Sequence, residues 1–187
     1  MTMKKLVTQT ENLYIKTLEL SDAYLLKKWG QFNDPYLLGY NYSNLSDFEI
    51  EFWYKTIKIP TKNYFSVFTK EDNNFIGFIG IKEIKYFRKT SKLGIVFDPN
   101  FVSKGFGYEA MKSFLSVYFF DYNFREMTLD VNLFNTRAMK LYKKLGFEVY
   151  GKSNEIFENQ DVEFDERYFL YKYGKIYSKL LKMRIRR

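Results

Sequence analysis

The hydrophobic pattern of the N-terminal third predicts one strand and two helices. Apolar and polar residues alternate over 12–18, which is the period of a half-buried β-strand. Apolar residues recur at helical spacing over 23–29 and again after Ser46-Asp47, a pair that can cap a helix N-terminus. The second helix is expected to end before Pro60, and the stretch 33–45, which contains Asn, Gly and Pro, is expected to be a loop.

The rest of the chain reads mainly as strands, with two further helices between them. A turn-forming cluster at 71–74 separates two strand patterns, so this pair is expected to form a β-hairpin. Helical patterns cover 108–121 and 136–144, and Gly146 closes the second of them. The predicted strands of this part cover residues 64–69, 75–86, 91–97 and 127–131, with strand-like segments at 147–157 and 163–172.

This order of elements predicts the fold class. A hairpin followed by helix, strand, helix and strand fits an α+β domain, with a mixed, mostly antiparallel sheet flanked by helices, better than a doubly wound parallel sheet. No repeat or linker is visible, so residues 1–172 are interpreted as one domain. Residues 173–187 carry apolar residues among Lys and Arg and are expected to form a basic, amphipathic C-terminal helix. That helix would dock on the domain or on a second subunit; contact with RNA, the ribosome or a membrane surface is the bolder alternative.

The residue types that the chain lacks exclude several kinds of chemistry. There is no Cys and no His, so disulfide frameworks, the usual zinc sites and Ser-His-Asp or Cys-His nucleophiles are ruled out. Acid–base chemistry must come from Glu, Asp, Tyr, Lys or a relayed water. The formal net charge of +8 favours anionic partners, either nucleic acid or a phosphorylated cofactor. Neither a signal-peptide pattern nor an apolar run of about 18 residues is present, so a cytoplasmic location without a membrane span is expected.

The segment that follows the predicted strand 91–97 is the first candidate ligand site. Lys104-Gly105-Phe106-Gly107 stands immediately before a helix. Glycines let the backbone approach a ligand, and a helix start offers unpaired N–H groups and positive dipole, which suits a pyrophosphate. A P-loop is disfavoured because no Gly-Lys-Ser/Thr triplet follows the glycines. A Rossmann fingerprint is disfavoured because the motif comes after a hairpin. On this motif alone, a simple tight turn is the competing interpretation.

The second candidate lies on the predicted helix 136–144. Asn135 can cap this helix, and Tyr142 follows two turns later on the same face. Ala138 lies between them and is small, which leaves room beside that face. An isolated helical Tyr is more often a core aromatic residue, so this interpretation of Tyr142 also stays open.

In combination, these segments resemble the GCN5-related N-acetyltransferase (GNAT) family, and within it the branch of ribosomal-protein and spermidine acetyltransferases. The similarity runs from about Leu13 to about Gly151. One departure is Val102, where the family usually has Gln or Arg, and it puts a side-chain phosphate contact at that position in doubt. The resemblance rests on Gly94-Ile-Val-Phe-Asp-Pro99, Gly105-Phe-Gly-Tyr-Glu-Ala110 and Asn135-Thr-Arg-Ala-Met-Lys-Leu-Tyr-Lys-Lys-Leu-Gly-Phe147, in order and at the usual separations.

The resemblance implies a GNAT fold, acetyl-CoA as cofactor, and a set of site residues. The strand Leu93–Phe97 would carry a bulge and splay from a parallel strand, Met127–Val131, with the pantetheine arm in the opening. Tyr142 would stand near the sulfur and protonate the leaving thiolate. Cofactor contacts would come from Ile95, Val96 and Phe97 at the pantetheine and thioester, from Ser103, Lys104, Gly105, Phe106, Gly107 and Tyr108 at the pyrophosphate, and from Asn135.

The implied activity is transfer of the acetyl group from acetyl-CoA to a primary amine. Because no Cys can form an acyl-enzyme, direct attack within a ternary complex is the natural hypothesis. The attacking ammonium, with a pKa of about 10.4 like that of Lys, must first lose a proton. Glu83 is the candidate base, since spermidine acetyltransferases carry a Glu at this place; a solvated strand-edge charge and a water relay are the alternatives.

The acceptor amine stays open. A polyamine would need an acidic pocket, and Asp47, Glu49 and Glu51 lie in the part of this fold that usually borders the acceptor groove, although helix starts are commonly acidic for dipole reasons alone. Protein N-termini, amino sugars and aminoglycosides are alternatives, and a homo-oligomer is compatible with the family. Two hypotheses from other classes compete: a non-catalytic acyl-CoA sensor, and a basic RNA-binding module, for which no ribonucleoprotein motif is visible.

Overall fold

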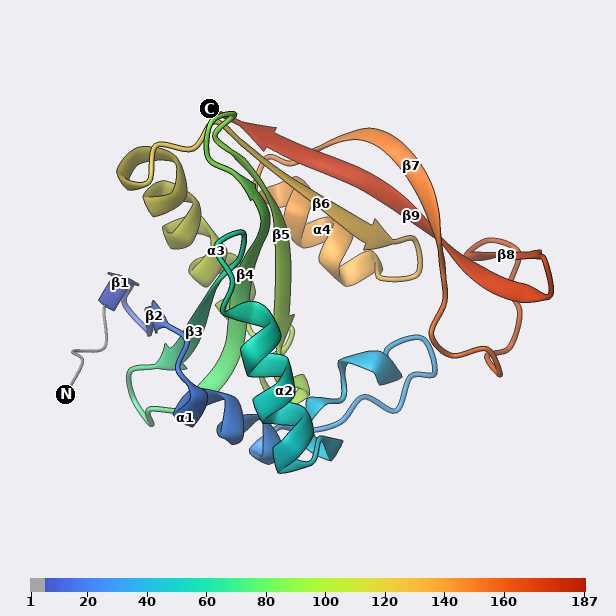
Figure 1. Cartoon of the computed structure of the whole chain (residues 1–187), viewed down its shortest axis with the longest axis horizontal. Helices are drawn as coiled ribbons and strands as arrows, with labels where there is room; N and C mark the ends of the chain where they lie inside the picture. The colour runs from blue at the N-terminus through green and yellow to red at the C-terminus, as the bar shows by residue number, and fades with distance from the viewer. Residues whose placement is uncertain (1–5) are drawn as a thin grey trace.

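The computed structural model describes residues 6–187, so residues 1–5 of the predicted domain lie outside the described residues. The described strands form one sheet in the order β1-β2-β3-β4-β5-β6-β9-β7, with β8 paired to β9 (Figure 1). All neighbouring pairs are antiparallel except β5 with β6. The predicted mixed, mostly antiparallel sheet is confirmed. Its strands are β1 (Leu6–Gln9), β2 (Leu13–Thr17), β3 (Asn63–Thr69), β4 (Phe75–Lys85), β5 (Thr90–Phe97), β6 (Glu126–Asn132), β7 (Glu148–Ile156), β8 (Phe169–Lys172) and β9 (Lys175–Arg186).

The helices follow the predicted positions with one exception. Ser46 accepts a hydrogen bond from the Glu49 N–H, and the Glu49 carboxylate accepts one from the Ser46 N–H in return, so a capping box starts the helix after the predicted loop. The expected helix at 23–29 is only a short α-helix followed by a 3₁₀ segment at 24–28. The helices are α1 (Leu20–Ala23), α2 (Asp47–Ile57), α3 (Phe106–Ser116), which continues as a π-helical turn to Asp121, and α4 (Thr136–Lys144). None of the helices in residues 6–187 is long and apolar enough to cross a membrane.

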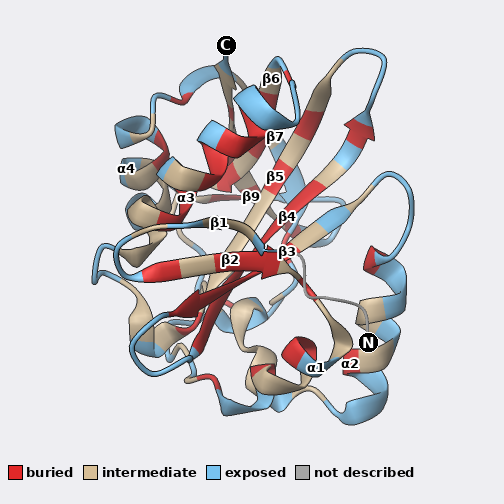
Figure 2. Ribbon diagram, turned by 90° about the vertical axis from the view of Figure 1, so that its left-hand side faces the viewer, coloured by how far each residue is buried: buried red, intermediate tan, exposed pale blue. Residues whose placement is uncertain are grey.

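The sheet separates two hydrophobic cores. Successive side chains of a strand point to opposite faces, so Ile95 and Phe97 pack on the larger core with α3 and α4. Val96, between them, joins Phe78 in a second core with α2. Figure 2 shows the result: buried residues follow the central strands, while the outer surfaces of the helices are exposed. The two faces of β5 therefore look into two different environments.

The parallel pair β5–β6 is joined over only part of its length. Thr90–Lys92 pairs with Glu126–Thr128, and beyond these residues the two strands form no further pairs. The predicted opening between Leu93–Phe97 and the neighbouring parallel strand is confirmed. The expected bulge on Leu93–Phe97 is wrong, because β5 keeps an unshifted register with β4 from Lys92 to Phe97.

The irregularity lies instead in β4. Between Lys82 and Lys85 the register shifts by one residue, and Glu83 has a φ of 51°. A positive φ in a non-glycine residue is uncommon and is typical of the extra residue in a β-bulge. Glu83 therefore sits on a bulge, with its side chain displaced from the regular alternation of the strand.

The predicted C-terminal helix is wrong. Lys175–Arg186 is the strand β9, which lies between β6 and β7 and hydrogen-bonds to both. Its apolar residues fit a helical spacing as well as an alternating one, but only an extended chain can satisfy the facing edges of two strands. The tail therefore belongs to the sheet of the domain, and the boundary expected after residue 172 falls inside a β8–β9 hairpin. A basic helix for RNA or a membrane surface is absent from the described residues.

Candidate active site

A cleft of about 510 Å³ passes through the sheet where β5 and β6 part. Its size is that of a small-molecule site. On the face of α3 and α4, Ile95, Phe97 and Tyr142 border it; on the face of α2, Val96 and Phe78 do. A ligand bound on the first face can therefore reach a second ligand on the other through the gap between the strands.

The N-terminus of α3 offers free backbone donors to this cleft. Ser46 caps α2 and Asn135 caps α4, but no side chain among residues 6–187 caps α3. Gly105 is the N-cap residue and has a φ of 89°, a conformation that favours glycine. Together with Gly107 it lines the cleft. The first-turn amides and the helix dipole thus offer what an anion needs, and the anion site at this loop stays a prediction.

The six predicted loop residues divide into two groups. Ser103, Gly105, Gly107 and Tyr108 line the cleft, while Lys104 and Phe106 do not. The Lys104 ammonium lies 5.1 Å from the centre of the Phe101 ring, and the Phe106 side chain packs in the larger core. The side chains of Lys104 and Phe106 do not line the cleft, and the ligand contacts predicted for these two residues stay predictions. Val102 does line the cleft, as an apolar wall.

Asn135 and Arg137 form the edge of the cleft beside α4. The Asn135 Oδ1 accepts a hydrogen bond of 3.1 Å from the Ala138 N–H, so only its Nδ2 group can donate to a ligand. Arg137, which sequence reasoning missed, lines the same edge with its guanidinium 5.5 Å from the centre of the Phe32 ring. The Arg137 guanidinium adds a fixed positive charge near the anion site.

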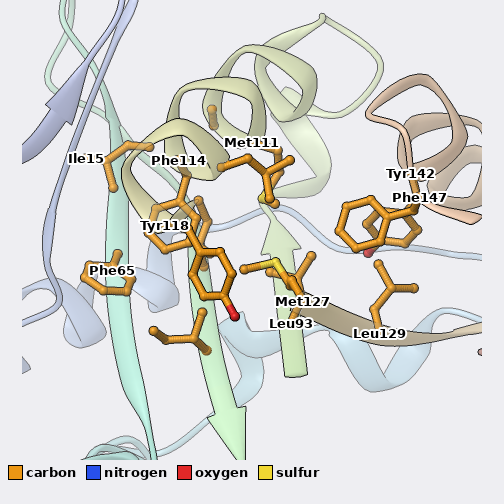
Figure 3. Close-up of a cluster of buried hydrophobic side chains, with 14 of the residues drawn as sticks. Ile15, Phe65, Leu93, Met111, Phe114, Tyr118, Met127, Leu129, Tyr142 and Phe147 are labelled. Atoms are coloured by element: carbon orange, nitrogen blue, oxygen red, sulfur yellow. The ribbon is translucent and has the colours of Figure 1, made fainter. Parts of the chain in front are cut away.

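Tyr142 closes the cleft on the face of α3 and α4. Figure 3 shows its ring beside Phe147 and close to Leu129 at one end of the core, and the two ring centres lie 5.7 Å apart. The side chain is buried, yet it lines the cleft, and its hydroxyl makes no hydrogen bond with a described residue. Burial, and to a lesser degree Tyr40, raise the pKa of this hydroxyl. Tyr142 therefore keeps its proton at neutral pH and can donate it.

The other side of the cleft is an aromatic chamber with a few polar groups. Asp130 lies 2.6 Å from the Lys92 ammonium and is held by it. Among residues 6–187, the buried Asn132 Oδ1 has no hydrogen-bond partner and Glu155 forms no ion pair. Lys82 also lines this side. The aromatic walls are Phe32, Tyr40, Tyr42, Trp53, Tyr64 and Phe78.

Comparison with known proteins identifies the family. Residues 12–148 match the acetyltransferase (GNAT) domain family. The chain belongs to the GNAT acetyltransferases. It is an acetyl-CoA-dependent N-acetyltransferase, and the fold, cofactor and reaction class implied by the sequence are confirmed. The cleft of this acetyltransferase suits acetyl-CoA, because an uncapped helix N-terminus lies at one end and the gap in the sheet at the other.

Curated relatives and solved structures agree with this assignment. The acetyltransferase is 27% identical to the spermidine N(1)-acetyltransferase of Escherichia coli K12 over 78% of this chain and 73% of that protein. It is also 27% identical to the uncharacterized N-acetyltransferase p20 of Bacillus licheniformis, over 76% and 82% of the two chains. The fold matches the Vibrio cholerae spermidine N-acetyltransferase in complex with CoA and spermine with a TM-score of 0.73, at 23% identity over 95% and 96% of the two chains. A dodecameric structure of the Vibrio cholerae enzyme matches with a TM-score of 0.66, at 22% identity over 95% of each chain.

The acidic residues predicted to border the acceptor groove lie outside the cleft of the acetyltransferase. Asp47 forms an ion pair with Lys27, Glu49 completes the capping box, and Glu51 accepts a hydrogen bond of 2.6 Å from the Tyr24 hydroxyl. All three carboxylates start or anchor α2, and these structural contacts explain why acidic residues occur there without a role in binding the acceptor. The carboxylates of the cleft are those of Asp130 and Glu155.

Glu83 lies outside the cleft as well. Its carboxylate is 3.8 Å from the Lys92 ammonium, and it borders a neighbouring groove that contains Lys85, Glu126 and Lys182. The side chain is 64% exposed. Lys92 and Asp130 lie between Glu83 and the cleft, and the role of Glu83 as the base stays a prediction.

A Glu83→Gln substitution tests that role. Because the exposed Glu83 carboxylate lies outside the cleft, we expect kcat/KM for the best amine to change by about twofold or less, which is about 0.4 kcal/mol of activation free energy. Steady-state kinetics measure this, with Glu126→Gln as the matched control from the same groove. A loss of more than about tenfold in kcat/KM in the Glu83 variant alone would identify Glu83 as the base.

Proposed function

We propose that this acetyltransferase transfers the acetyl group of acetyl-CoA directly to a primary amine of a polyamine. The observation that carries the proposal is the aromatic chamber with its carboxylates, on the opposite side of the sheet from the uncapped helix. Aromatic walls accommodate methylene chains and attract cations through their ring faces. The names of the spermidine acetyltransferases among its relatives support the same class of acceptor.

Two groups in the chamber are available to hold the amine. Asp130 is already paired with Lys92, so Glu155 is the carboxylate left to attract an ammonium. The Asn132 Oδ1 is a buried acceptor without a donor among residues 6–187, an arrangement that costs free energy unless a ligand supplies the donor. An amine N–H that donates to Asn132 would remove that cost.

The proposed reaction uses the remaining residues in fixed roles. The first-turn amides of α3, with Gly105 and Gly107, hold the pyrophosphate, and Asn135 contributes its Nδ2 group. Backbone groups of Ile95, Val96 and Phe97, free of partners on the β6 side, orient the thioester that acetyl-CoA supplies. Tyr142 donates its proton to the sulfur as the neutral amine nitrogen bonds to the acetyl carbonyl carbon and the carbon–sulfur bond breaks. The proton that the nitrogen releases passes to water, and water returns a proton to the Tyr142 phenolate. The two substrates meet in the gap, which allows direct transfer without an acyl-enzyme.

Thiol release dependent on acetyl-CoA tests the proposed function. The panel holds spermidine, spermine, N-terminal peptides of ribosomal proteins, aminoglycosides and amino-sugar nucleotides. The enzyme has no Cys, so a thiol reagent gives no background from the protein. We expect turnover with the polyamines. Turnover confined to another class would reject the polyamine acceptor, and acetyl-CoA binding without turnover on any amine would favour an acyl-CoA sensor.

A Glu155→Gln substitution tests how the acceptor is held. Loss of the free carboxylate should raise KM for spermidine about tenfold, which corresponds to about 1.4 kcal/mol, with little change in kcat. Glu148→Gln is the matched control, because Glu148 is exposed on the same strand but does not line the cleft. An unchanged KM in the Glu155 variant would move the ammonium site elsewhere in the chamber.

A further inference from the structure

Lys82 is a primary amine that the fold places inside the cleft. It lies on β4, on the side of the aromatic chamber, and its side chain crosses Gly94 on the neighbouring strand. A Cβ at Gly94 would be 3.1 Å from both the Cε and the Nζ atoms of Lys82. The missing side chain at Gly94 thus gives the Lys82 amine its place. The next residue along β5 is Ile95, the first of the three residues whose backbone groups are proposed above to orient the thioester.

The surroundings of Lys82 leave its amine unpaired. Lys92 is its direct cross-strand partner, and this second lysine is held by Asp130 at 2.6 Å and lies 3.8 Å from Glu83. Within residues 6–187, nothing accepts a hydrogen bond from the Lys82 ammonium or forms an ion pair with it.

Burial and the neighbouring lysines lower the pKa of the Lys82 amine. Burial is the largest cause and the charge of Lys92 the second, with Lys62 acting in the same direction. Glu83 and Asp130 oppose this shift but do not cancel it. Compared with an exposed lysine, a larger fraction of Lys82 is therefore neutral at a given pH, and only the neutral amine is a nucleophile.

We propose that Lys82 is an internal acetyl acceptor, modified on Nζ when acetyl-CoA is bound and no external amine is present. In this step the neutral Lys82 nitrogen forms a bond to the acetyl carbonyl carbon and the carbon–sulfur bond breaks. The thiolate takes up a proton and the nitrogen releases one, which leaves N-acetyl-lysine and the free thiol of CoA. The inference rests on acetyl-CoA in the cleft and not on which amine is the external acceptor.

Acetylation of Lys82 would change the acceptor chamber. It removes one positive charge and adds an acetyl group beside Gly94, in the space that an incoming amine must enter. The modified enzyme is therefore expected to turn over external amines more slowly. Supply of acceptor would protect the enzyme, because an amine that occupies the chamber keeps Lys82 from the thioester.

Peptide mass spectrometry tests the inference on the full chain incubated with acetyl-CoA alone. An amine fixed next to the thioester has a high effective concentration, so Lys82 should be acetylated at least about 100-fold faster than exposed lysines. Lys92 is the internal control, because it lines the same cleft but is ion-paired. The rate should not depend on enzyme concentration, should rise with pH as more Lys82 becomes neutral, and should fall when excess CoA or spermidine is added.

Two variants separate this modification from a general chemical background. Lys82→Arg keeps the charge but cannot be acetylated, and it should abolish the time-dependent loss of amine turnover after incubation with acetyl-CoA. Gly94→Ala should displace the Lys82 amine and slow its acetylation, and circular dichroism shows whether this variant folds. Uniform acetylation of exposed lysines, with Lys82 no faster, would overturn the inference.

The outcomes also distinguish this inference from the proposed function. Acetylated Lys82 in an enzyme that ignores every polyamine would keep the inference and reject the polyamine acceptor. The opposite result has two parts: the enzyme turns over spermidine rapidly, and Lys82 stays unmodified in a separate incubation with acetyl-CoA alone. That result would reject the inference and keep the proposed function.

Discussion

A Tyr142→Phe variant should turn over its best amine about 100-fold more slowly than the wild type, because a positioned general acid contributes about 10²–10⁴-fold. Burial raises the pKa of Tyr142, so this phenol is fully protonated at neutral pH, and its hydroxyl has no competing hydrogen bond with a described residue. Phe keeps the ring in contact with Phe147 and removes only the proton donor. Acetyl-CoA affinity, measured by calorimetry, should therefore stay within about twofold.

The control is Tyr54→Phe, which removes a hydroxyl from α2 that does not line the cleft. This variant should retain wild-type kcat. If the Tyr142 variant also kept wild-type kcat, the thiolate would take its proton from water or another group, and Tyr142 would be a core residue that happens to border the cleft.

Gly107→Glu should weaken acetyl-CoA binding by about 100-fold without unfolding the protein. Gly107 lies in the first turn of α3 and lines the cleft. A carboxylate there would compete with the pyrophosphate for the free amides and repel it, and a charged hydrogen bond is worth about 1.5–3 kcal/mol. The same carboxylate would interact favourably with the positive end of the helix dipole, so the melting temperature should be unchanged or slightly higher.

Gly107→Ala is the matched control. A Cβ at this position would meet Leu141 at 3.5 Å and Phe97 at 3.7 Å, which are ordinary contacts, so the variant should fold and bind acetyl-CoA. Calorimetry and thermal melting of both variants measure the effect. Full acetyl-CoA affinity in Gly107→Glu would move the pyrophosphate site away from this loop.

The cofactor half of the cleft could be predicted from the sequence because its determinants are local. Gly105 before a helix start, and Asn135 as a cap two turns before Tyr142, are patterns within a few residues of each other. The structure brings these three residues to one cleft. Lys104 and Phe106 are neighbours of these residues in the sequence, but their side chains lie against Phe101 and the larger core and do not line the cleft.

The acceptor half could not be predicted, because its residues come from distant segments. Lys82, Asn132 and Glu155 lie on three strands and meet only after the sheet has formed. One signal was available: Asp130 and Asn132 alternate with the buried Leu129 and Val131, which indicates that they face away from the larger core. Which ligand they face depends on the opening between β5 and β6, and no local pattern records it.

The sequence by itself determined the order of most elements, the glycine-containing start of α3 and the absence of Cys and His chemistry, because capping, periodicity and residue type act over short distances. The tertiary structure decided the remainder. The tail 173–187 has apolar spacing for either a helix or a strand, and it became β9 because β6 and β7 offered unpaired edges on both sides. Glu83 was turned out of the cleft by a bulge and Lys82 was drawn into it by the space above Gly94, since backbone pairing and side-chain volume across strands set both positions.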